Sequence, residues 1–361
     1  MMNSFSAYWR DVANGIHIET GVKLLLLVLA PFSLTYSLIQ RLRAFFYKTG
    51  ILKSRKLPRP VISIGNITVG GTGKTPVTAY IARWLLQQGY RVTVLSRGYG
   101  GSLEGQIAVV SDGATIMMGP GECGDEPYLL ASTIPGLMVV IGTDRYAAGL
   151  LAMQQLAPDV FLLDDGFQHL RLQRDLNILL LDHSRPYGNG WTLPGGLLRE
   201  PVCAGKRADL IIHTRCPAGT TFSASTELVP NCKANHRIVD LLPLSGGAPT
   251  LLPGLSPCKV LAFAGIAEPS VFFDELLTLG FELVHTIRFS DHTRYADVEV
   301  SEILDAMRRY GAEVAITTEK DGVKLKGLSH DIRCRIQLAR LELVIDEPSP
   351  LLNMLRNLLQ K

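Results

Sequence analysis

Short hydrophobic runs alternate with amphipathic segments along most of the chain beyond residue 60. Runs rich in Val, Ile and Leu, which are typical of buried strands, occupy 61–64, 92–95, 138–141, 160–163, 178–181 and 210–213. Helical spacing of apolar residues covers 76–88 and 145–156, between these runs. Apolar strands that alternate with helices predict a mostly parallel sheet with helices on both faces.

The alternation stops over residues 217–257, which are rich in Pro, Gly, Ser and Thr and show little periodicity. We interpret this stretch as a linker. The pattern then resumes, with strands predicted over 259–264, 282–287, 313–317 and 336–345 and helices over 269–279 and 301–310. This shorter series predicts a second, smaller α/β domain after the linker.

Before residue 60 the pattern is of a different kind. Residues 24–40 contain no charged side chain, and as a helix they would reach roughly 25 Å, short of the roughly 30 Å hydrocarbon core of a bilayer. Pro31 interrupts this run. After Pro31 one helical face collects apolar side chains, namely Leu34, Leu38, Leu42, Phe45 and Phe46. Three interpretations stay open: a helix packed on the protein body, a helix lying in the membrane interface, and a membrane span.

Charge is distributed unevenly along the chain. The 361 residues include 36 Lys/Arg and 33 Asp/Glu, a net charge of +3 that is too small to indicate a nucleic-acid partner. Residues 1–60 alone carry nine basic and two acidic side chains, which favours contact with an anionic surface such as a membrane. A hydrophobic share of 47% excludes a disordered chain. The six cysteines show no C-x-x-C spacing, which indicates reduced thiols in a cytosolic protein and neither a disulfide framework nor a zinc site.

The segment after the first predicted strand carries a phosphate-binding loop, GNITVGGTGKTP at 65–76. In the pattern G-x-x-x-x-G-K-[ST], backbone N–H groups converge on phosphate oxygens, the Lys neutralises their charge and the hydroxyl ligates Mg²⁺. Thr68 stands at the first glycine position, whereas Lys74 and Thr75 match the pattern. The predicted nucleotide-binding residues are Thr68, Val69, Gly70, Gly71, Thr72, Gly73, Lys74 and Thr75.

Neighbouring motifs narrow the choice of nucleotide and of protein class. The chain has no guanine-reading N-K-x-D motif, and the nearest match, TEKD at 318–321, has the wrong spacing. Switch proteins with K-G-G-x-G-K-[ST] carry a bridging lysine whose position is Val69 here, which disfavours a dimer-bridging switch. ATP together with Mg²⁺ is therefore the predicted cofactor set.

Two adjacent carboxylates follow the predicted strand 160–163, in DDGFQH at 164–169. An Asp at the end of a strand beside the phosphate loop is what the Mg²⁺ site of a P-loop enzyme requires. Neighbouring residues on a strand point in opposite directions. We therefore expect one of Asp164 and Asp165 to serve the metal and the other to support it, without a choice between them. A turn-forming role before Gly166 is the alternative.

Two further segments hold candidate acid–base groups. Asp125, in GDEP at 124–127, precedes a predicted helix, and capping of that helix is its statistically favoured role. Phosphoryl transfer to an alcohol nevertheless needs a carboxylate that accepts the hydroxyl proton. His292, in SDH at 290–292, is also either structural or catalytic, and a single His is more often structural.

Together these segments resemble the tetraacyldisaccharide 4′-kinase family, the lipid A precursor kinases of Gram-negative bacteria. The resemblance extends over most of the chain and includes the N-terminal hydrophobic helix. Besides the phosphate loop, the matching segments are SRGYGG at 96–101, GDEP at 124–127, DRY at 144–146, DDGFQH at 164–169, LPGGLLREP at 193–201, FSDH at 289–292 and TEKD at 318–321.

The resemblance implies a reaction and a role for each candidate residue. The reaction is transfer of the ATP γ-phosphate to the 4′-hydroxyl of an acylated glucosamine disaccharide 1-phosphate, giving lipid IVA. Asp125 becomes the catalytic carboxylate in a dyad with His292, which reverses the capping preference, and Lys74 acts on the phosphates. The implied metal-site residues are Thr75, Asp164, Asp165 and, more weakly, Glu200. Arg145 and Arg199 are implied as phosphate contacts.

The resemblance also implies a fold, an organisation and a location. The fold is α/β, a P-loop NTPase-type sheet flanked by helices, with a second α/β domain and an N-terminal membrane-associated helix. The predicted parts are 1–59 for the helical segment, 60–216 for the nucleotide-binding core, 217–257 for the linker and 258–361 for the C-terminal domain. The implied location is the cytoplasmic face of the inner membrane, with the lipid substrate and the membrane surface as partners. Neither a nucleic acid nor an obligate protein partner is predicted.

Two rival functions fit parts of the same pattern. A membrane-recruited P-loop ATPase switch would need the phosphate loop but no acid–base pair on the acceptor side, which Asp125 and His292 would supply. A soluble kinase for a small polar alcohol would have no use for the basic, amphipathic residues 32–59.

Overall fold

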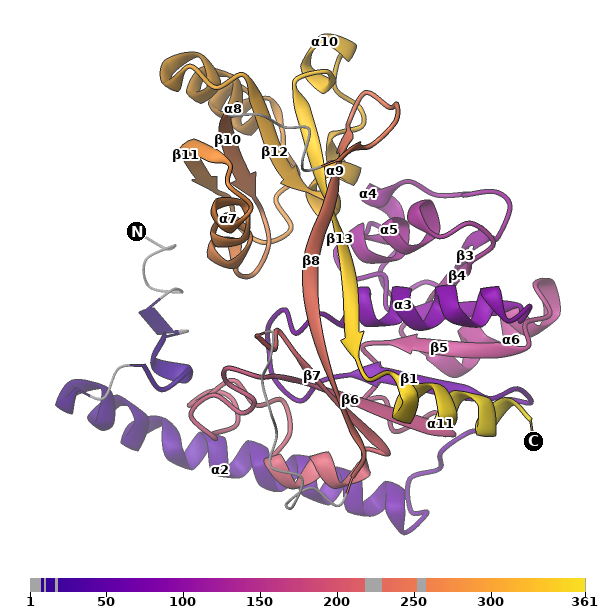
Figure 1. The fold of residues 1–361 in the computed structure, drawn as a ribbon. Coiled ribbons are helices and arrows are strands. Elements are labelled where there is room, and N and C mark those ends of the chain that lie inside the picture. The colour runs from indigo at the N-terminus through magenta and orange to yellow at the C-terminus, as the bar shows by residue number, and fades with distance from the viewer. Residues whose placement is uncertain (1–7, 10, 17–18, 218–228, 252–257, 361) are drawn as a thin grey trace.

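One continuous sheet runs through the whole molecule. The computed structural model describes residues 8–9, 11–16, 19–217, 229–251 and 258–360. Thirteen strands of these residues form the sheet, in the order β11-β10-β12-β13-β8-β7-β6-β1-β5-β2-β4-β3, with β9 paired to β8. The sheet connects two units that lie one above the other in Figure 1, where the phosphate-loop helix α3 (Lys74–Gln87) lies across the middle of the molecule.

The larger unit, here called the core unit, is a parallel sheet with one antiparallel edge strand, β3. Its strands are β1 (Val61–Gly65), β2 (Val92–Ser96), β3 (Ala108–Asp112), β4 (Met138–Ile141), β5 (Val160–Asp164), β6 (Leu176–Asp182) and β7 (Leu210–Thr214). Besides α3, its helices are α4 (Pro120–Cys123), α5 (Asp125–Thr133), α6 (Arg145–Gln155) and the 3₁₀ turn η1 (Val202–Arg207).

Both faces of the core sheet are buried, which explains why its strands are mostly apolar on both sides. Successive side chains of a strand point to opposite faces. Ile62 and Ile64 accordingly pack into the cluster under α3 and α5, whereas Val61 packs into the cluster under α6. The predicted parallel sheet with helices on both faces is therefore confirmed.

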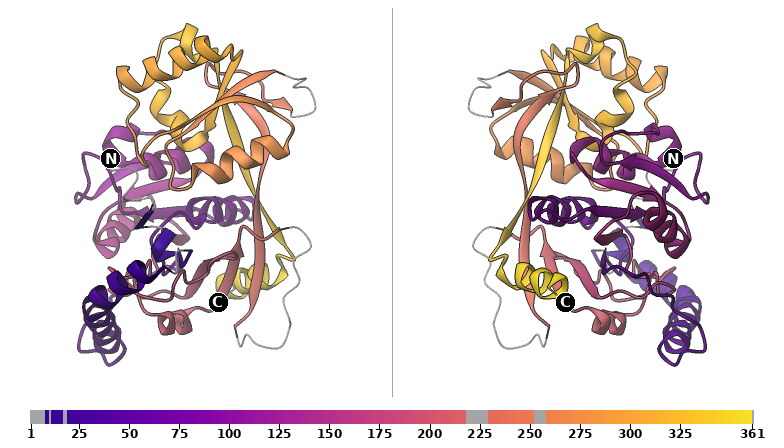
Figure 2. Two further views of the ribbon diagram at one scale, coloured as in Figure 1. Left: turned by 90° about the vertical axis from the view of Figure 1, so that its left-hand side faces the viewer. Right: turned by 90° about the vertical axis from the view of Figure 1, so that its right-hand side faces the viewer.

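The smaller unit, here called the distal unit, is a second α/β layer. It contains β10 (Lys259–Ala264), β11 (Glu282–Arg288), β12 (Val314–Thr318), α7 (Pro269–Thr278), α8 (Asp297–Tyr310), α9 (Glu319–Leu325) and α10 (His330–Arg333). Helix α8 covers one face of its sheet with Ile303 and Met307, and α7 covers the other with Phe272 and Leu276. The two side views in Figure 2 show this unit stacked on the core unit.

The two units are connected by a pair of long antiparallel strands, here called the ribbon. It consists of β8 (Asn231–Pro243) and β13 (Ile336–Asp346), and β9 (Thr250–Leu251) pairs with β8. The strands pair from Gln337 opposite Pro243 to Asp346 opposite Lys233. At one end β8 pairs with β7 of the core unit, and at the other end β13 pairs with β12 of the distal unit. The side-by-side course of β8 and β13 is visible in Figure 1.

The ribbon supplies side chains to the hydrophobic clusters of both units. Leu343 and Ile345 pack in the core-unit cluster, whereas Ile238 and Leu241 pack in the distal cluster. Helix α11 (Ser349–Leu359), which follows β13, returns to the core unit and buries Leu351 and Leu355 there. The predicted division at residues 257/258 therefore does not coincide with the packing, because the end of the chain belongs to the core unit.

Most predicted elements are present within two residues of their expected bounds, but several elements were missed, among them the short helices α4, α9 and α10. Strand β8 lies inside the region predicted as a linker, of which 218–228 and 252–257 are outside the described residues. The edge strand β3 and the terminal helix α11 were not predicted either. The expected start of α8 was late, since the helix begins at Asp297 and not at residue 301.

The N-terminal helix α2 (Thr20–Lys48) is longer than its uncharged run suggested, because it continues through Pro31. Pro31 lies on the exposed side, so its ring meets no neighbouring element. The helix contacts the core unit through polar atoms. The Ser33 hydroxyl accepts from the Gly195 N–H at 2.9 Å, and the Tyr36 hydroxyl donates to the Arg199 carbonyl at 3.1 Å. Figure 1 shows α2 along the base of the core unit.

Candidate functional site

The phosphate loop connects the buried strand β1 to the first turn of α3, as the motif predicted. Gly73 forms the N-cap of α3 with φ +79°, a left-handed conformation that favours glycine. A Cβ atom at Gly73 would lie 2.7 Å from the His236 ring of the ribbon. The loop therefore needs glycine here for two reasons, and the free N–H groups at the start of α3 face the cavity as an anion site requires.

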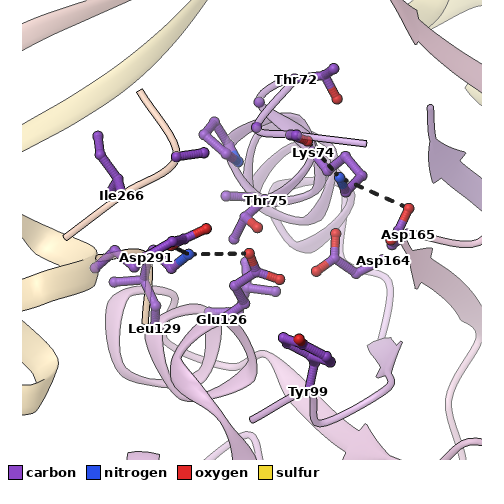
Figure 3. Close-up of a pocket in the computed structure, with 18 of the residues that line it drawn as sticks. Thr72, Lys74, Thr75, Tyr99, Glu126, Leu129, Asp164, Asp165, Ile266 and Asp291 are labelled. Carbon is purple, nitrogen blue, oxygen red and sulfur yellow. Dashed lines mark hydrogen bonds and ion pairs between the residues drawn. The ribbon is translucent and has the colours of Figure 1, made fainter. Parts of the chain in front are cut away.

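Lys74 lies between the loop and the carboxylates. Its Nζ atom is 3.5 Å from the Gly70 carbonyl oxygen and 4.0 Å from Asp165 Oδ1, the ion pair drawn in Figure 3. Thr75 follows it in the same turn. All the predicted nucleotide-binding residues except Thr68 line the main cavity: Val69, Gly70, Gly71, Thr72, Gly73, Lys74 and Thr75. Thr68 is buried behind the loop, where its hydroxyl receives a hydrogen bond from Asn66 at 3.2 Å.

Asp164, the last residue of β5, is fully buried beside α3. Thr78 donates a hydrogen bond to its Oδ1 atom at 3.0 Å. Burial, and then the nearby charges of Glu126 and Asp165, raise the pKa of Asp164. A bound cation would offset this cost of ionising Asp164, so the site fits Mg²⁺ beside Thr75.

Asp165 is held differently from its neighbour. Arg199 binds both of its carboxylate oxygens, at 2.9 and 2.8 Å, from the segment LPGGLLREP. Burial alone would raise the pKa of Asp165, but the hydrogen bonds from Arg199 and the charge of Lys74 outweigh it and lower the pKa. Asp165 is therefore ionised, and Arg199 and Lys74 balance its negative charge. Burial and the neighbouring carboxylates disfavour a negative charge on Asp164. The structure thus separates two carboxylates that the sequence could not distinguish.

Glu200 lies apart from these carboxylates. It is 1% exposed and does not line the main cavity, and its Oε2 atom pairs with Arg207 at 2.5 Å and accepts from Gln168 at 3.4 Å. Among the residues that the structure describes, no three His, Cys, Asp or Glu side chains group closely enough to hold a metal on their own. A metal at this site would depend on Thr75, one carboxylate and the nucleotide phosphates.

Arg145 and Arg199 both line the cavity on the side of the carboxylates. Arg145 donates from Nη1 to the Gly142 carbonyl at 2.7 Å, and burial lowers the pKa of its guanidinium to about 10. It stays protonated at neutral pH. The two arginines therefore provide positive charge next to the phosphate loop, where a phosphate group would meet it.

Asp125 and His292 are in contact although they lie 167 residues apart, on opposite units. His292 Nδ1 is 3.1 Å from Asp125 Oδ2. Asp125 opens α5 of the core unit, and His292 lies after β11 of the distal unit with a left-handed φ of +62°. Capping is not the role of Asp125, because the N-cap residue of α5 is Gly124. The structure thus brings together the two residues that the resemblance pairs.

Charged side chains surround this pair, and sequence reasoning missed them. Lys324 Nζ is 3.4 Å from Asp125 Oδ2, and Lys320 Nζ is 3.7 Å from Glu126 and 3.2 Å from Asp291. Glu126 and Asp291 are labelled on one side of the phosphate-loop helix in Figure 3. Both lysines belong to α9, which begins with the TEKD segment, so that segment is part of the site and not a base-reading motif.

A second missed cluster lies beside the phosphate loop. Arg215, at the end of β7 with φ +59°, donates to the Gly71 carbonyl at 2.6 Å and to Asp182 at 2.8 Å, and it pairs with Glu268 of the distal unit. His236 packs against Gly73, and burial lowers the pKa of its imidazole to about 4. Arg215 thereby connects a loop carbonyl to one carboxylate of each unit.

The main cavity extends from α2 to the distal unit. Its volume is about 1180 Å³, which is large for a nucleotide alone and leaves room for a second substrate. Tyr36, Gln40 and Arg43 of α2 line one end, and Phe272 and Leu341 line the other. The phosphate loop, the carboxylates and His292 lie between these ends. The arrangement suits transfer between a nucleotide on one side and an acceptor that enters beside α2.

Comparison with known proteins agrees with this geometry. The family model for tetraacyldisaccharide-1-P 4′-kinase matches residues 25–360. The chain is similar to the tetraacyldisaccharide 4′-kinase of Pelobacter propionicus, with 60% identity over 100% of both chains, and to that of Geobacter sulfurreducens, with 53% identity over 89% of this chain and 90% of the relative. A crystal structure described as the "apo" form of LpxK from Aquifex aeolicus in complex with ATP superimposes with a TM-score of 0.79 at 35% identity, covering 93% of this chain and 99% of the other.

We predict that Lys74→Ala lowers kcat by at least about a thousandfold, because the charge that faces the nucleotide phosphates is lost. The melting temperature should change little, since Lys74 makes one ion pair at 4.0 Å and one weak hydrogen bond. Gln87→Ala, at the exposed far end of the same helix and outside the cavity lining, is the control. Turnover near the wild-type rate in Lys74→Ala would contradict the phosphate-loop assignment.

Proposed function

This chain belongs to the tetraacyldisaccharide-1-P 4′-kinase family, and we propose that Asp125 and His292 are the dyad through which it phosphorylates its acceptor. The reaction is transfer of the γ-phosphate of ATP to the 4′-hydroxyl of tetraacyldisaccharide 1-phosphate, a step of lipid A biosynthesis that forms lipid IVA. The observation that carries the assignment is the 3.1 Å contact between Asp125 Oδ2 and His292 Nδ1 beside the phosphate loop.

Phosphoryl transfer passes through a loose transition state, so the protein mainly has to position the two substrates and compensate the negative charge of the phosphoryl group. The acceptor oxygen forms a bond to the γ-phosphorus, the bond from that phosphorus to the bridging oxygen of ADP breaks, and the hydroxyl proton passes to the dyad. Lys74 and the N-terminus of α3 face the phosphates. Both contacts to Asp125 involve Oδ2, from His292 and Lys324, so we assign Oδ1 to accept the proton.

We assign Mg²⁺ to Thr75 and Asp164. When bound, the cation would neutralise charge that develops on the transferred phosphoryl group. Asp164 is the better candidate because Arg199 already occupies both oxygens of Asp165. Asp165 then holds Arg199 in place, and Arg199 faces the acceptor side together with Arg145.

A membrane surface is the second part of the proposal. The apolar face predicted for α2 is exposed, with Leu34 at 61%, Leu38 at 56% and Phe45 at 55%, so the helix is not packed on the protein body by this face. It is also long and apolar enough to cross a bilayer. We favour an interfacial position at the cytoplasmic face of the inner membrane, because the opposite face is fixed to the core unit and lines the cavity. A lipid acceptor would reach the cavity from there.

The direct test of the reaction is to incubate the protein with ATP, Mg²⁺ and acylated disaccharide 1-phosphate. We expect a product heavier by one phosphate, with ADP formed in equal amount. Formation of ADP without a phosphorylated lipid would favour the ATPase switch. Transfer to small soluble sugars at the same rate would favour a soluble alcohol kinase.

We predict that Asp125→Ala and His292→Ala each lower kcat by at least about a hundredfold, with little change in the KM for ATP. The double variant should lose far less than the product of the two single losses, because residues that act as a unit are non-additive. Strictly multiplicative losses would rule out the dyad. Asp297→Ala, at the start of α8, is an acidic control outside the site.

We predict that replacing Leu34, Leu38 and Phe45 together by Ser weakens binding to anionic vesicles by at least about a hundredfold, since each buried side chain contributes about 1.5 kcal/mol. Vesicle sedimentation measures the effect. Tyr36→Phe, on the docked face of α2, is the control and should bind as the wild type does. Unchanged sedimentation of the triple variant would leave the membrane assignment without support.

A further inference from the structure

Lys324 is the most deeply enclosed cation next to the proposed dyad. Its side chain is 7% exposed, and its Nζ atom lies 3.4 Å from Asp125 Oδ2 and 3.2 Å from Asp321 Oδ1. It does not line the main cavity. A lysine that is buried at this depth is stable only where carboxylates compensate its charge. Its position between two carboxylates meets that condition.

Asp321 anchors this lysine to the distal unit. The Asp321 side chain is completely buried, and its Oδ2 atom accepts hydrogen bonds from the Gly265 N–H at 3.0 Å and from the Thr318 hydroxyl at 2.8 Å. These bonds leave Oδ1 to face Lys324. The Lys324 ammonium also lies 5.3 Å from the centre of the Tyr295 ring, at cation–π distance. The lysine is thereby fixed within the distal unit before it meets Asp125.

The same small region positions His292. A Cβ atom at Gly265 would lie 3.0 Å from the Tyr295 hydroxyl, 3.1 Å from Asp321 Oδ1 and 3.1 Å from the Ser290 carbonyl. The loop that carries His292 is therefore in close contact with the groups that hold Lys324. Lys324 and His292 approach the same oxygen of Asp125, one from α9 and one from the loop after β11.

We propose that Lys324 is a positioning residue for the phosphoryl transfer: from its anchor on Asp321 it fixes the Asp125 carboxylate and keeps it ionised, so that Oδ1 can accept the acceptor proton. The inference rests on the proposed function of the dyad. It also explains why a carboxylate that is only 12% exposed carries a charge. Burial alone would raise the pKa of Asp125, but the His292 hydrogen bond and the Lys324 charge outweigh it and lower the pKa.

Several charged and titratable side chains besides Lys324 surround Asp125 and His292, and a test of Lys324 must leave them unchanged. The titratable and charged side chains that act on this carboxylate or contact its His292 partner are Lys320, Lys324, Asp291, Cys123, Tyr99 and Tyr295, and Asp321 and Glu126 pair with the two lysines. Removal of the Lys324 charge leaves the others in place. The pKa of Asp125 then rises, because a nearby positive charge that lowers it has been lost. A base must be deprotonated to act. When the pH is lowered, the variant therefore loses activity at a higher pH than the wild type does.

The experiment is a pH profile of kcat for the full-length protein in detergent with ATP, Mg²⁺ and acylated disaccharide 1-phosphate. In Lys324→Met we expect kcat at neutral pH to fall about ten- to a hundredfold, as misplacement of a reacting group does. The acidic limb should move up by about 1–2 pH units. Lys324→Arg should restore the position of the limb, and the KM for ATP should be unchanged in both variants. Lys326→Met, at the end of the same helix and exposed, is the matched control and should behave as the wild type does.

Asp321→Asn provides a test in the opposite direction. It removes the negative charge that Asp321 places beside Lys324, so the positive charge of Lys324 acts more strongly on Asp125. The acidic limb of the pH profile should therefore move to lower pH. This variant and Lys324→Gln replace Lys324→Met if melting curves show that the latter does not fold. A loss of kcat that is equal at every pH, or an arginine variant as impaired as the methionine variant, would overturn the inference. An unchanged Lys324→Met would also overturn it and leave the kinase assignment intact, whereas an inactive wild-type protein would overturn the kinase assignment itself.

Discussion

The pairing of β8 with β13 is the constraint on which the rest of the molecule depends. These two strands pair along their full length, from Gln337 with Pro243 to Asp346 with Lys233. Each unit has its own hydrophobic clusters, and the ribbon contributes side chains to both. Without it, the core unit would hold a phosphate loop and Asp125 but no His292, and the distal unit would hold His292 and Lys324 but no nucleotide site.

Several contacts between the units are ionic. The hydrophobic contacts of β8 and β13 lie within each unit, whereas charged side chains of the two units pair beside the cavity, whose lining also includes apolar residues such as Phe272 and Leu341. Asp125 meets His292 and Lys324, Glu126 meets Lys320, and Arg215 meets Glu268. Ion pairs at a partly open cavity contribute little to stability when they are exposed. They are, however, sensitive to a phosphate or a metal placed between them, so substrate charge can influence how the units meet.

Much of the fold could be predicted from the sequence because the core strands are buried on both faces. Their uninterrupted apolar runs, such as 160–163 and 178–181, leave little ambiguity, and the phosphate loop follows from its glycines and its Lys74. Strand β8 could not be recognised in the same way, since its residues change environment along its length. Ala234 packs in the core unit, Ile238 packs in the distal unit, and Asn235 and His236 between them line the cavity. No single period describes such a strand.

The candidate site shows a similar limit. Asp164 and Asp165 were recognised by their place after a strand, but their different roles depend on Arg199 and Thr78, which no local pattern connects to them. The pair Asp125–His292 came from the resemblance, because nothing in the spacing of residues 167 positions apart indicates contact. Lys324 gave one usable signal, its i,i+3 spacing from Asp321 on a helix.

The two ends of the main cavity explain why one chain combines a helix with an exposed apolar face and a nucleotide site. Helix α2 is fixed to the core unit by hydrogen bonds that Ser33 accepts and that Tyr36 and Arg43 donate, which leave the apolar face with Leu34, Leu38 and Phe45 exposed. The docked polar face therefore also forms the wall of the cavity, through Tyr36, Gln40 and Arg43. Exposed apolar residues on one side and a polar cavity wall on the other are what an acceptor with acyl chains and a phosphorylated sugar requires. In the proposed interfacial position its chains would stay in the lipid while its hydroxyl reaches the proposed dyad, and α2 would then also limit where the acceptor enters.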